Sequence, residues 1–379
     1  MLEKVIVKNY KSLKNETIID FTADKYAPLS DTHVKDGMLK GLFFFGANSS
    51  GKSNILDSIR ILLELLFLDK SIDFSFQTCL FSNENIELEY FFRIDSHTID
   101  YFIEINKIGQ IVKEVLKDDL KIMLKREENN VETILTDTKH YNENSVDDEM
   151  LFLRNIYFNT RFAGFPELIK WFQYLQNSIY IHFQQKKFIS FSNKIQLDFM
   201  ENTSEEDIKL INDFFKQTHI CEEVKYTNRA IIGLDTVIDT GDRKNFYIKS
   251  NDSDYWFPLF LESQGIQDLM RLLPIIIHII HHDGLLIMDG FSLSLHNGVE
   301  ELLINYLFQN IISSQVIVAT HSTHILKNSL IRPDQLYAVD FQGNEGTFIT
   351  KFSKETPRTS QNLEKMYLSG IFGGIINYK

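Results

Sequence analysis

The chain has 379 residues, of which 44% are hydrophobic, and a formal net charge of −13 at pH 7. This length suits one large α/β domain with an insertion, or two domains. The acidic balance argues against indiscriminate binding to nucleic acid, which depends on clustered cations. The apolar runs are too short to span a bilayer, no secretory signal is evident, and Cys79 and Cys221 form no disulfide framework or metal-binding spacing. We therefore expect a soluble cytoplasmic protein.

The first forty residues are typical of two strands and a loop, and residues 39–45 of a buried strand. A helical pattern of apolar residues occupies residues 55–63. Between them lies a complete GxxxxGK[ST] motif, in the strand–loop–helix context that a phosphate-binding loop requires. The motif consists of Gly46, Ala47, Asn48, Ser49, Ser50, Gly51, Lys52 and Ser53.

The fixed residues of this loop suit contact with a nucleoside triphosphate. Glycines let the backbone approach the phosphates, and amide groups at a helix N-terminus face the negative charge. Lys52 is expected to reach the β/γ oxygens, and the Ser53 hydroxyl to bind Mg²⁺. A chance glycine-rich loop is the alternative, which the flanking strand and helix disfavour. The sequence therefore predicts binding of a nucleoside triphosphate.

The middle of the chain changes pattern twice. Residues 86–135 alternate between apolar and polar positions, which predicts an antiparallel sheet. Polar residues 137–149 mark an exposed loop or boundary. Residues 150–220 are typical of helices, and Thr203-Ser204-Glu205-Glu206 resembles a helix cap. Beyond Glu262, helix and strand alternate as in a parallel sheet covered by helices.

Three motifs follow in the last third of the chain. Leu285–Asp289 is an apolar strand ending in a carboxylate, where a Walker B aspartate would hold Mg²⁺ through water. Ser263-Gln264-Gly265 lies at the start of a helical run some 20 residues earlier. Val316–Ser322 is a second buried strand, and it ends at His321. In isolation, the serine–glycine pair would be a common turn and His321 a structural histidine.

The order of these motifs resembles that in ABC-class ATPases of the SMC and RecF kind. Several local stretches are similar to bacterial AAA-family, RecF/OLD-like ATPases found in phage-defence operons. The resemblance covers residues 1–60 and 260–379. It is carried by Asn9-Tyr10-Lys11-Ser12-Leu13, Gly51-Lys52-Ser53-Asn54-Ile55-Leu56-Asp57, Glu262-Ser263-Gln264-Gly265, Ser294-Leu295-His296 and Tyr367-Leu368-Ser369-Gly370-Ile371-Phe372-Gly373-Gly374.

The resemblance implies an α/β fold, namely an ABC-type ATPase head whose mixed sheet combines an antiparallel part with a parallel core. We expect an N-terminal lobe over residues 1–140, a mainly helical insertion over 141–225 and a C-terminal lobe over 226–379. ATP and Mg²⁺ are the implied cofactors. Asn54 is expected to join the loop residues in binding ATP, and Tyr10 is a weak candidate to stack on adenine.

The resemblance also implies a dimer or higher oligomer. In such ATPases two protomers sandwich two nucleotides, with the phosphate loop of one facing the signature of the other. Ser263 and Gly265 would then contact the γ-phosphate across the interface. Ser53 and Asp289 would hold Mg²⁺, and His321 would sense the γ-phosphate, which makes Asp289 and His321 the candidate catalytic residues.

One residue departs from the family pattern at a position that matters for catalysis. Where a glutamate base usually follows the Walker B aspartate, this chain has Gly290. Either a natural, weakened ATPase or a substitution that traps the ATP-bound dimer would explain this, and differences at Ser292, Asn297 and Ile371 favour the first. Losing a general base costs about 10²–10⁴ in rate. We therefore expect slow hydrolysis, with His296 or His321 as partial substitutes for the base.

The resemblance implies an ATPase subunit that controls a separately encoded effector in anti-phage defence, since too few residues follow His321 for the nuclease domain of OLD-type relatives. A RecF/SMC-like ATPase clamp for DNA maintenance or repair is the alternative, and a structural ATP-bound scaffold is the third.

His278, His281 and His282 could share a helix face for a metal, but an ordinary helix end explains them better. The aromatic stretch around Trp171 suits core packing or partner docking.

Overall fold

The computed structural model describes residues 1–68, 77–141, 146–192, 204–220, 223–227, 229–232, 236–239, 245–249, 255–291 and 296–374. Cys221, Ser292, Ser294 and Leu295 lie outside these residues. The strands are β1 Leu2–Lys8, β2 Thr17–Asp20, β3 Val34–Lys35, β4 Met38–Leu39, β5 Gly41–Phe45, β6 Ile86–Ile94, β7 His97–Ile105, β8 Ile111–Asp118, β9 Lys121–Glu127, β10 Asn130–Thr133, β11 His140–Tyr141, β12 Ile179–His182, β13 Lys187–Ser190, β14 Glu223–Thr227, β15 Arg229–Ile232, β16 Thr236–Asp239, β17 Asn245–Lys249, β18 Trp256–Pro258, β19 Leu285–Asp289, β20 Gln315–Thr320, β21 Leu336–Phe341 and β22 Thr347–Lys351. The α-helices are α1 Ser30–His33, α2 Lys52–Phe67, α3 Phe152–Thr160, α4 Pro166–Gln176, α6 Glu205–Thr218, α7 Gln264–His281, α8 Asn297–Asn310 and α9 Leu363–Leu368, and short 3₁₀ helices occur at Leu259–Leu261 (η2) and Pro333–Gln335 (η4), among others.

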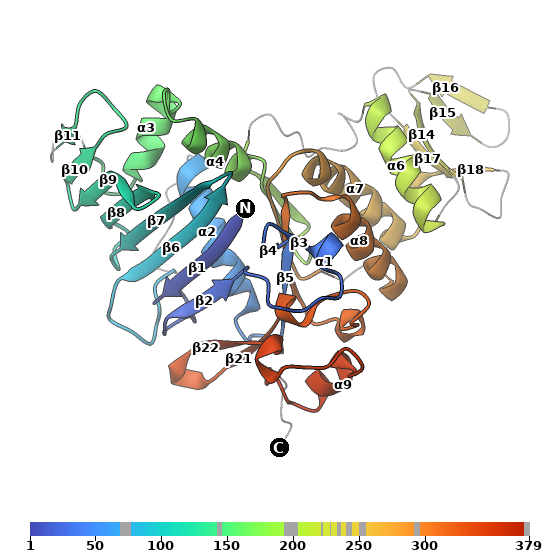
Figure 1. Ribbon diagram of the computed structural model, residues 1–379. Coiled ribbons are helices and arrows are strands. Elements are labelled where there is room, and N and C mark those ends of the chain that lie inside the picture. The colour runs from blue at the N-terminus through green and yellow to red at the C-terminus, as the bar shows by residue number, and fades with distance from the viewer. Residues whose placement is uncertain are drawn as a thin grey trace.

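An antiparallel sheet forms one side of the molecule, in the order β11-β10-β9-β8-β7-β6-β1-β2 (Figure 1). Strands β6 and β7 pair along their full length, from Ile86 opposite Ile105 to Ile94 opposite His97. Their buried residues alternate with more exposed ones, because successive side chains point to opposite faces of a sheet. The antiparallel sheet predicted for residues 86–135 is confirmed, and β1 and β2 extend it.

A second sheet carries the motifs, in the order β13-β12-β19-β20-β5-β21-β22. Strands β12, β19, β20, β5 and β21 are parallel neighbours, whereas β13 and β22 pair antiparallel at the two edges. The predicted parallel core is therefore confirmed. The expectation of a mainly helical segment over residues 141–225 is wrong for residues 179–190, because β12 is an interior strand of this sheet.

Two hydrophobic clusters cover the two faces of the second sheet. Phe44 belongs to the cluster that includes α2, α4 and the antiparallel sheet, whereas Phe43 and Phe45 belong to the one with α6, α7 and α8. This division follows from the two-residue period of a strand. Trp171 is fully buried between Phe92, Tyr101 and Phe172, so the aromatic stretch is core.

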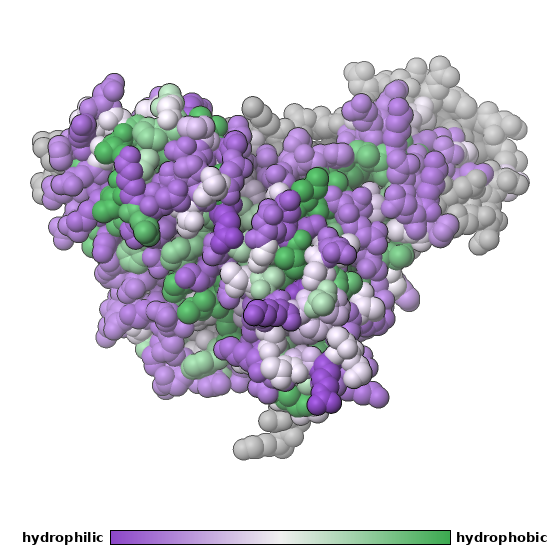
Figure 2. All heavy atoms as spheres, in the orientation of Figure 1, coloured by the Kyte–Doolittle hydropathy of each residue, from purple (hydrophilic) through white to green (hydrophobic). Residues whose placement is uncertain are grey.

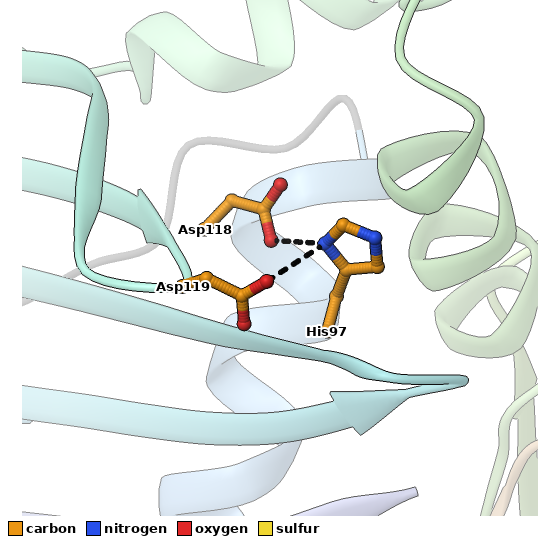
Figure 3. Close-up of side chains that lie close together, drawn as sticks. All are labelled: His97, Asp118 and Asp119. Carbon is orange, nitrogen blue, oxygen red and sulfur yellow. Dashed lines mark hydrogen bonds and ion pairs between the residues drawn. The ribbon is translucent and has the colours of Figure 1, made fainter.

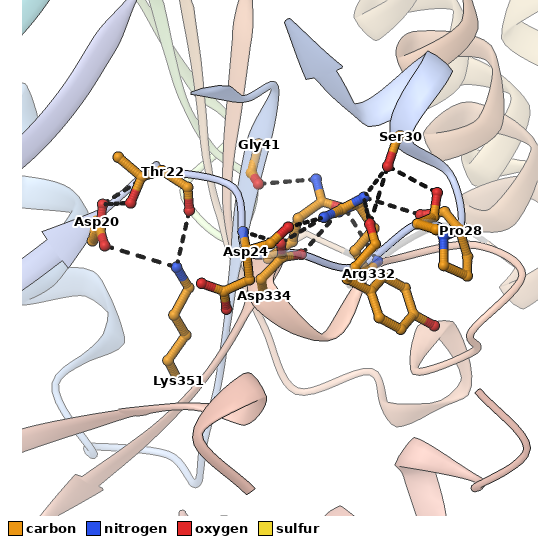
Figure 4. Close-up of polar contacts among 12 residues, drawn as sticks. Asp20, Thr22, Asp24, Pro28, Ser30, Gly41, Arg332, Asp334 and Lys351 are labelled. Atoms are coloured by element: carbon orange, nitrogen blue, oxygen red, sulfur yellow. Dashed lines mark hydrogen bonds and ion pairs between the residues drawn. The ribbon is translucent and has the colours of Figure 1, made fainter. Parts of the chain in front are cut away.

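A buried ion pair fastens the N-terminal segment to the last third of the chain (Figure 4). The Arg332 guanidinium contacts the Asp334 carboxylate at 2.7 Å, and both side chains are at most 1% exposed. Arg332 also donates to the carbonyl oxygens of Asp24, Tyr26 and Pro28. These bonds satisfy most of the guanidinium donors, which a buried charge requires.

The outer face is polar, in keeping with the net charge of −13. Figure 2 shows hydrophilic residues over most of the face in view, with apolar residues in scattered groups.

Helix α6 begins with a capping box between Ser204 and Asp207, as the cap motif predicted. Within the described residues, no helix has the length and hydropathy to span a lipid bilayer.

Candidate nucleotide-binding site

The predicted site residues gather where three parallel strands end. In the ladder, Asp289 of β19 lies opposite Ala319 of β20, and Ala319 lies opposite Phe44 of β5. Gly46, Gly290 and His321 each follow one of these strands. The carboxyl ends of parallel strands share one edge of a sheet, which is the usual place for a ligand in an open α/β fold.

The backbone of the loop at residues 46–53 requires its glycines. Gly51 caps α2 with φ of 104°, and a Cβ there would lie 2.1 Å from Thr347 Oγ1. A Cβ on Gly46 would lie 2.4 Å from the Val339 carbonyl oxygen. Ser49 also has a positive φ, 64°. The loop therefore places the N-terminus of a 16-residue helix, with its free amide groups, at the sheet edge.

A chain of hydrogen bonds from outside the motif holds this shape. Asn54 Nδ2 donates to Ser12 Oγ at 2.6 Å, and Ser12 Oγ lies 2.7 Å from Thr347 Oγ1. Thr347 Oγ1 in turn donates to the Ser50 carbonyl oxygen at 2.9 Å. Sequence reasoning missed the roles of Ser12 and Thr347. Ser12 lies within the stretch Asn9–Leu13, which carries part of the family resemblance. Thr347 lies in edge strand β22, whose sequence contains no motif.

The Lys52 side chain folds back over the start of the phosphate loop. Its Nζ donates to the carbonyl oxygens of Gly46 and Ala47, both at 2.7 Å. Burial lowers the pKa of Lys52, and the nearby Asp289 carboxylate acts in the opposite direction. The ammonium is thus held at the helix N-terminus, where it adds to the positive field that favours an anion.

Asp289 lies against the loop, as the motif order predicted. Its side chain is 8% exposed, and it accepts a hydrogen bond from the Ser53 side chain. Burial raises the pKa of Asp289, while the Ser53 hydrogen bond and the charges of His182 and Lys52 oppose that rise. Oδ2 of this carboxylate is buried and has no hydrogen-bond partner among the described residues.

His182 is a site residue that sequence reasoning missed. It ends β12, directly opposite Asp289 in the ladder, and its Nε2 lies 4.0 Å from Asp289 Oδ2. The signal was present in the sequence, since Ile179-Tyr180-Ile181-His182 is an apolar run ending in a polar residue, like the other two strands. It was overlooked because residues 150–220 were assigned to helices.

Gly290 adopts a backbone conformation that suits glycine. Its φ is 73°, and its N–H and that of Phe291 both donate to the Ala319 carbonyl oxygen at 3.1 Å. Another residue here would be strained by about 1–2 kcal/mol. Thr320 Oγ1 donates to the Phe291 carbonyl oxygen at 3.0 Å, which ties the strand before His321 to this turn.

His321 is exposed, whereas the residues after it are anchored. Ser322 Oγ donates to Glu300 Oε2 at 3.1 Å and lies 2.7 Å from His324 Nδ1. Burial raises the pKa of Glu300 to about 7 and lowers that of His324. Glu300 and His324, which lie 3.0 Å apart, are thereby both shifted toward their neutral forms.

The signature lies apart from this constellation. Ser263 caps α7 and accepts a long hydrogen bond, 3.4 Å, from Ile266 N. Ser263 is exposed and Gly265 is half-buried. Among the described residues, no hydrogen bond or ion pair joins either of them to residues 46–53. One copy of the chain therefore brings together the loop, Asp289 and the strand before His321, but not the signature.

Other candidate groups have structural explanations. Tyr10 is 1% exposed and donates to Gln77 Oε1 at 2.9 Å, so the expectation that it stacks on adenine is wrong. His278 Nε2 donates to the Asn177 carbonyl oxygen at 3.1 Å, and burial lowers the pKa of His278, as in an ordinary packed helix end. His296 caps α8 through Nδ1, which accepts from Gly298 N at 3.2 Å.

A further cluster lies on the antiparallel sheet (Figure 3). His97 Nδ1 is 2.9 Å from Asp118 Oδ1 and 3.2 Å from Asp119 Oδ2. The hydrogen bond that His97 donates to the Asp118 carboxylate, together with both carboxylate charges, raises the pKa of His97. The attraction between one imidazole and two carboxylates accounts for this arrangement without a metal ion.

Comparisons with known proteins agree with this geometry. The family described as "AAA domain, putative AbiEii toxin, Type IV TA system" matches residues 42–327. The fold is similar to an SMC head domain from Thermotoga maritima, with 15% identity, a TM-score of 0.53, and coverage of 92% of this chain and 98% of that one. It is also similar to an SMC head bound to the C-winged helix domain of ScpA, with 13% identity, a TM-score of 0.53, and coverage of 94% and 99%.

No curated protein matches the chain. The family match spans more than half of the sequence and includes the loop, the signature, the Walker B strand and His321. The chain therefore belongs to this AAA-domain family, and its fold is that of an SMC head domain.

Proposed function

We propose that the protein binds ATP with Mg²⁺, dimerises around the nucleotide, hydrolyses it slowly and thereby controls a separately encoded effector. The observation that carries the proposal is the convergence of Lys52, Ser53 and Asp289 at the edge of the parallel sheet. The loop amides and Lys52 would bind the phosphates, and Asn54 would keep the loop in shape through Ser12. Adenine recognition is an expectation of the family.

The residues at this edge fit a magnesium ion. Mg²⁺ prefers oxygen ligands and keeps several of its waters. The Ser53 hydroxyl and the Asp289 carboxylate are already within a hydrogen bond of each other, and a buried carboxylate oxygen without a partner is a group that a cation would stabilise. Ser53 and Asp289 would hold the ion, which would neutralise phosphate charge during phosphoryl transfer.

Slow hydrolysis follows from the turn after Asp289. Gly290 has no side chain to orient or deprotonate water, and its positive φ supports glycine as native to this position. His321 would face the γ-phosphate from the neighbouring strand end. We expect Gly290→Glu to raise the rate of ATP hydrolysis at least about 10-fold, because a general base supplies about 10²–10⁴ and the backbone strain at this position offsets part of the gain.

Gly290→Ala is the matched control for that experiment, because it imposes the same backbone strain without a carboxylate. It should leave the rate near that of the wild type. A wild-type rate of several turnovers per second would contradict the weakened site. An unchanged rate in Gly290→Glu, with ATP binding intact, would show that the missing base does not limit the reaction.

The exposed signature supports dimerisation. Ser263 and Gly265 lie at the N-terminus of α7, where free amide groups and the helix dipole favour an anion. Phe260 and Leu261, directly before the signature, are 76% and 67% exposed. Large exposed apolar side chains beside a polar motif are typical of an interface. A second copy would bring this surface against the phosphate loop and complete the site.

The effector and its setting rest on the family. The family description names a putative toxin of a type IV toxin–antitoxin system, which supports a role in such a system and, with it, in anti-phage defence. A DNA clamp of the SMC/RecF kind is the competing function. Purification of the tagged protein with and without ATP, from its native host, tests both.

Under our proposal, one protein should co-purify with the ATPase in a nucleotide-dependent ratio, and the purified ATPase should not retain duplex DNA. Salt-dependent binding to duplex DNA without such a protein would favour the clamp. Assembly that is indifferent to nucleotide would contradict both functions and favour an ATP-bound scaffold.

A further inference from the structure

Asp289 has one carboxylate oxygen that its own loop leaves unsatisfied. The Ser53 side chain is hydrogen-bonded to the carboxylate, whereas Oδ2 is buried and, within the part of the chain that the structure describes, has no hydrogen-bond partner. Lys52 Nζ is already bonded to the Gly46 and Ala47 carbonyl oxygens. Burying a carboxylate oxygen without a hydrogen-bond donor costs free energy. A side chain that faces this oxygen is therefore a candidate donor.

The group that faces Oδ2 is the imidazole of His182, with Nε2 at 4.0 Å. The sheet fixes this approach, because His182 and Asp289 are ladder partners in adjacent parallel strands. The Phe183 N–H donates to the Asp289 carbonyl oxygen at 3.0 Å, which continues the ladder past both residues. Partners in a ladder point to the same face of the sheet.

The tautomer of His182 makes Nε2 a donor. The Gln185 N–H donates to His182 Nδ1 at 3.2 Å, so Nδ1 accepts and the proton of the neutral ring lies on Nε2. This tautomer excludes Nε2 as a direct metal ligand. An N–H···O bond spans roughly 2.7–3.2 Å, so a rotation that closes about 1 Å would complete a hydrogen bond to Oδ2.

We infer that His182 is a positioning residue that holds the Asp289 carboxylate for a divalent cation. With Oδ2 bonded to His182 Nε2, the other carboxylate oxygen is directed to the Ser53 side of the site. Outer partners of this kind orient a ligating carboxylate, and their loss typically lowers metal affinity by about 10–100-fold. The inference rests on the proposed ATP–Mg²⁺ site and names a further residue that sets its cation affinity.

The test measures ATP affinity by calorimetry as a function of Mg²⁺ and, separately, Mn²⁺ concentration. His182→Ala should raise the cation concentration needed for half-maximal tight binding by about 10–100-fold. It should leave ATP affinity in EDTA within about twofold of the wild type, because the loop contacts persist. His182→Gln keeps an N–H donor at the end of its side chain and should recover most of the loss.

Two further variants separate a positioning role from a structural one. His140→Gln changes an exposed histidine of β11 and should behave as the wild type. His182→Ala should have no additional effect in an Asp289→Asn background if it acts through that carboxylate. An unchanged cation dependence in a folded His182→Ala protein would overturn the inference, as would an equal loss of affinity in EDTA. Failure of the wild type to bind ATP under either condition would instead refute the proposed function.

Discussion

The phosphate loop and the signature lie at two helix starts that are built in different ways. The loop before α2 is bracketed by Ser12, Asn54 and Thr347, and Asp289 closes it from a neighbouring strand. The start of α7 has one long capping bond and exposed apolar neighbours. Under the proposed function, one wall of the site would be complete within a chain, whereas the other would contact a second chain.

Two arginine–aspartate ion pairs also differ in how far they are buried. Arg332, which donates to the carbonyl oxygens of residues 24, 26 and 28, is buried with its carboxylate partner. Arg271 of α7 pairs with Asp268 at 3.1 Å, but its side chain is 49% exposed. Buried ion pairs are costly to break, while exposed ones contribute little.

Breaking the buried pair should have the largest effect on stability. Arg332→Ala leaves the Asp334 carboxylate buried and unpaired, so we expect a loss of about 3–5 kcal/mol in the free energy of unfolding. Arg271→Ala is the matched control and should cost about 0.5 kcal/mol or less. Urea denaturation measures both, and similar losses in the two variants would contradict the contrast between the buried and the exposed ion pair.

Removing the loop ammonium should weaken ATP binding more than removing the signature hydroxyl. Lys52→Ala deletes the charge at the helix start, and we expect a loss of about 100-fold in ATP affinity, or roughly 2.7 kcal/mol. Ser263→Ala should change the affinity of a single copy by less than about twofold, since its hydroxyl serves another protomer. Calorimetry at protein concentrations too low for dimers to form measures the ATP affinity of both variants. A larger loss in Ser263→Ala would place the signature in the same chain's site.

The buried carboxyl behind His321 should make stability depend on pH. Burial raises the pKa of Glu300 to about 7 from an ordinary value of 4.5, so the folded chain binds the proton more tightly than the unfolded chain. Stability should therefore fall as pH rises from about 4.5 to about 7, by about 2 kcal/mol. Glu300→Gln should abolish this slope, whereas the exposed Glu128→Gln should keep it. Denaturation curves at pH 5, 6, 7 and 8 provide the measurement, and a slope retained in Glu300→Gln would exclude Glu300 as its source.

The smallest expected difference in the free energy of unfolding concerns the hydrogen bonds at the N-termini of α2 and α7. Thr347→Val removes the hydroxyl that bonds the Ser50 carbonyl oxygen and should cost about 1–2 kcal/mol, because it leaves buried groups unsatisfied. Ser263→Ala removes only a long capping bond at an exposed position and should cost about 0.5 kcal/mol. Thermal unfolding of both variants measures this contrast, which equal costs would refute.

The sequence was informative where a residue's role depends on its immediate neighbours. The loop requires Gly46 and Gly51, and the apolar runs before Asp289 and His321 are the interior strands that their patterns predicted. It was uninformative where a role depends on distant partners. Thr347 reaches the loop from an edge strand, and His182 meets Asp289 only because β12 joins the parallel sheet. The apolar run of β12 is present in the sequence, but a run of four residues does not by itself distinguish a strand from part of a helix.

The central claim is that two copies enclose shared nucleotides, and the mass of the protein in solution tests it most directly. Light scattering with saturating ATP and Mg²⁺ should give twice the mass of the nucleotide-free protein. Lys52→Ala and Ser263→Arg should each stay at the mass of one copy. A wild-type protein that demonstrably binds ATP and yet remains a single copy would contradict the account.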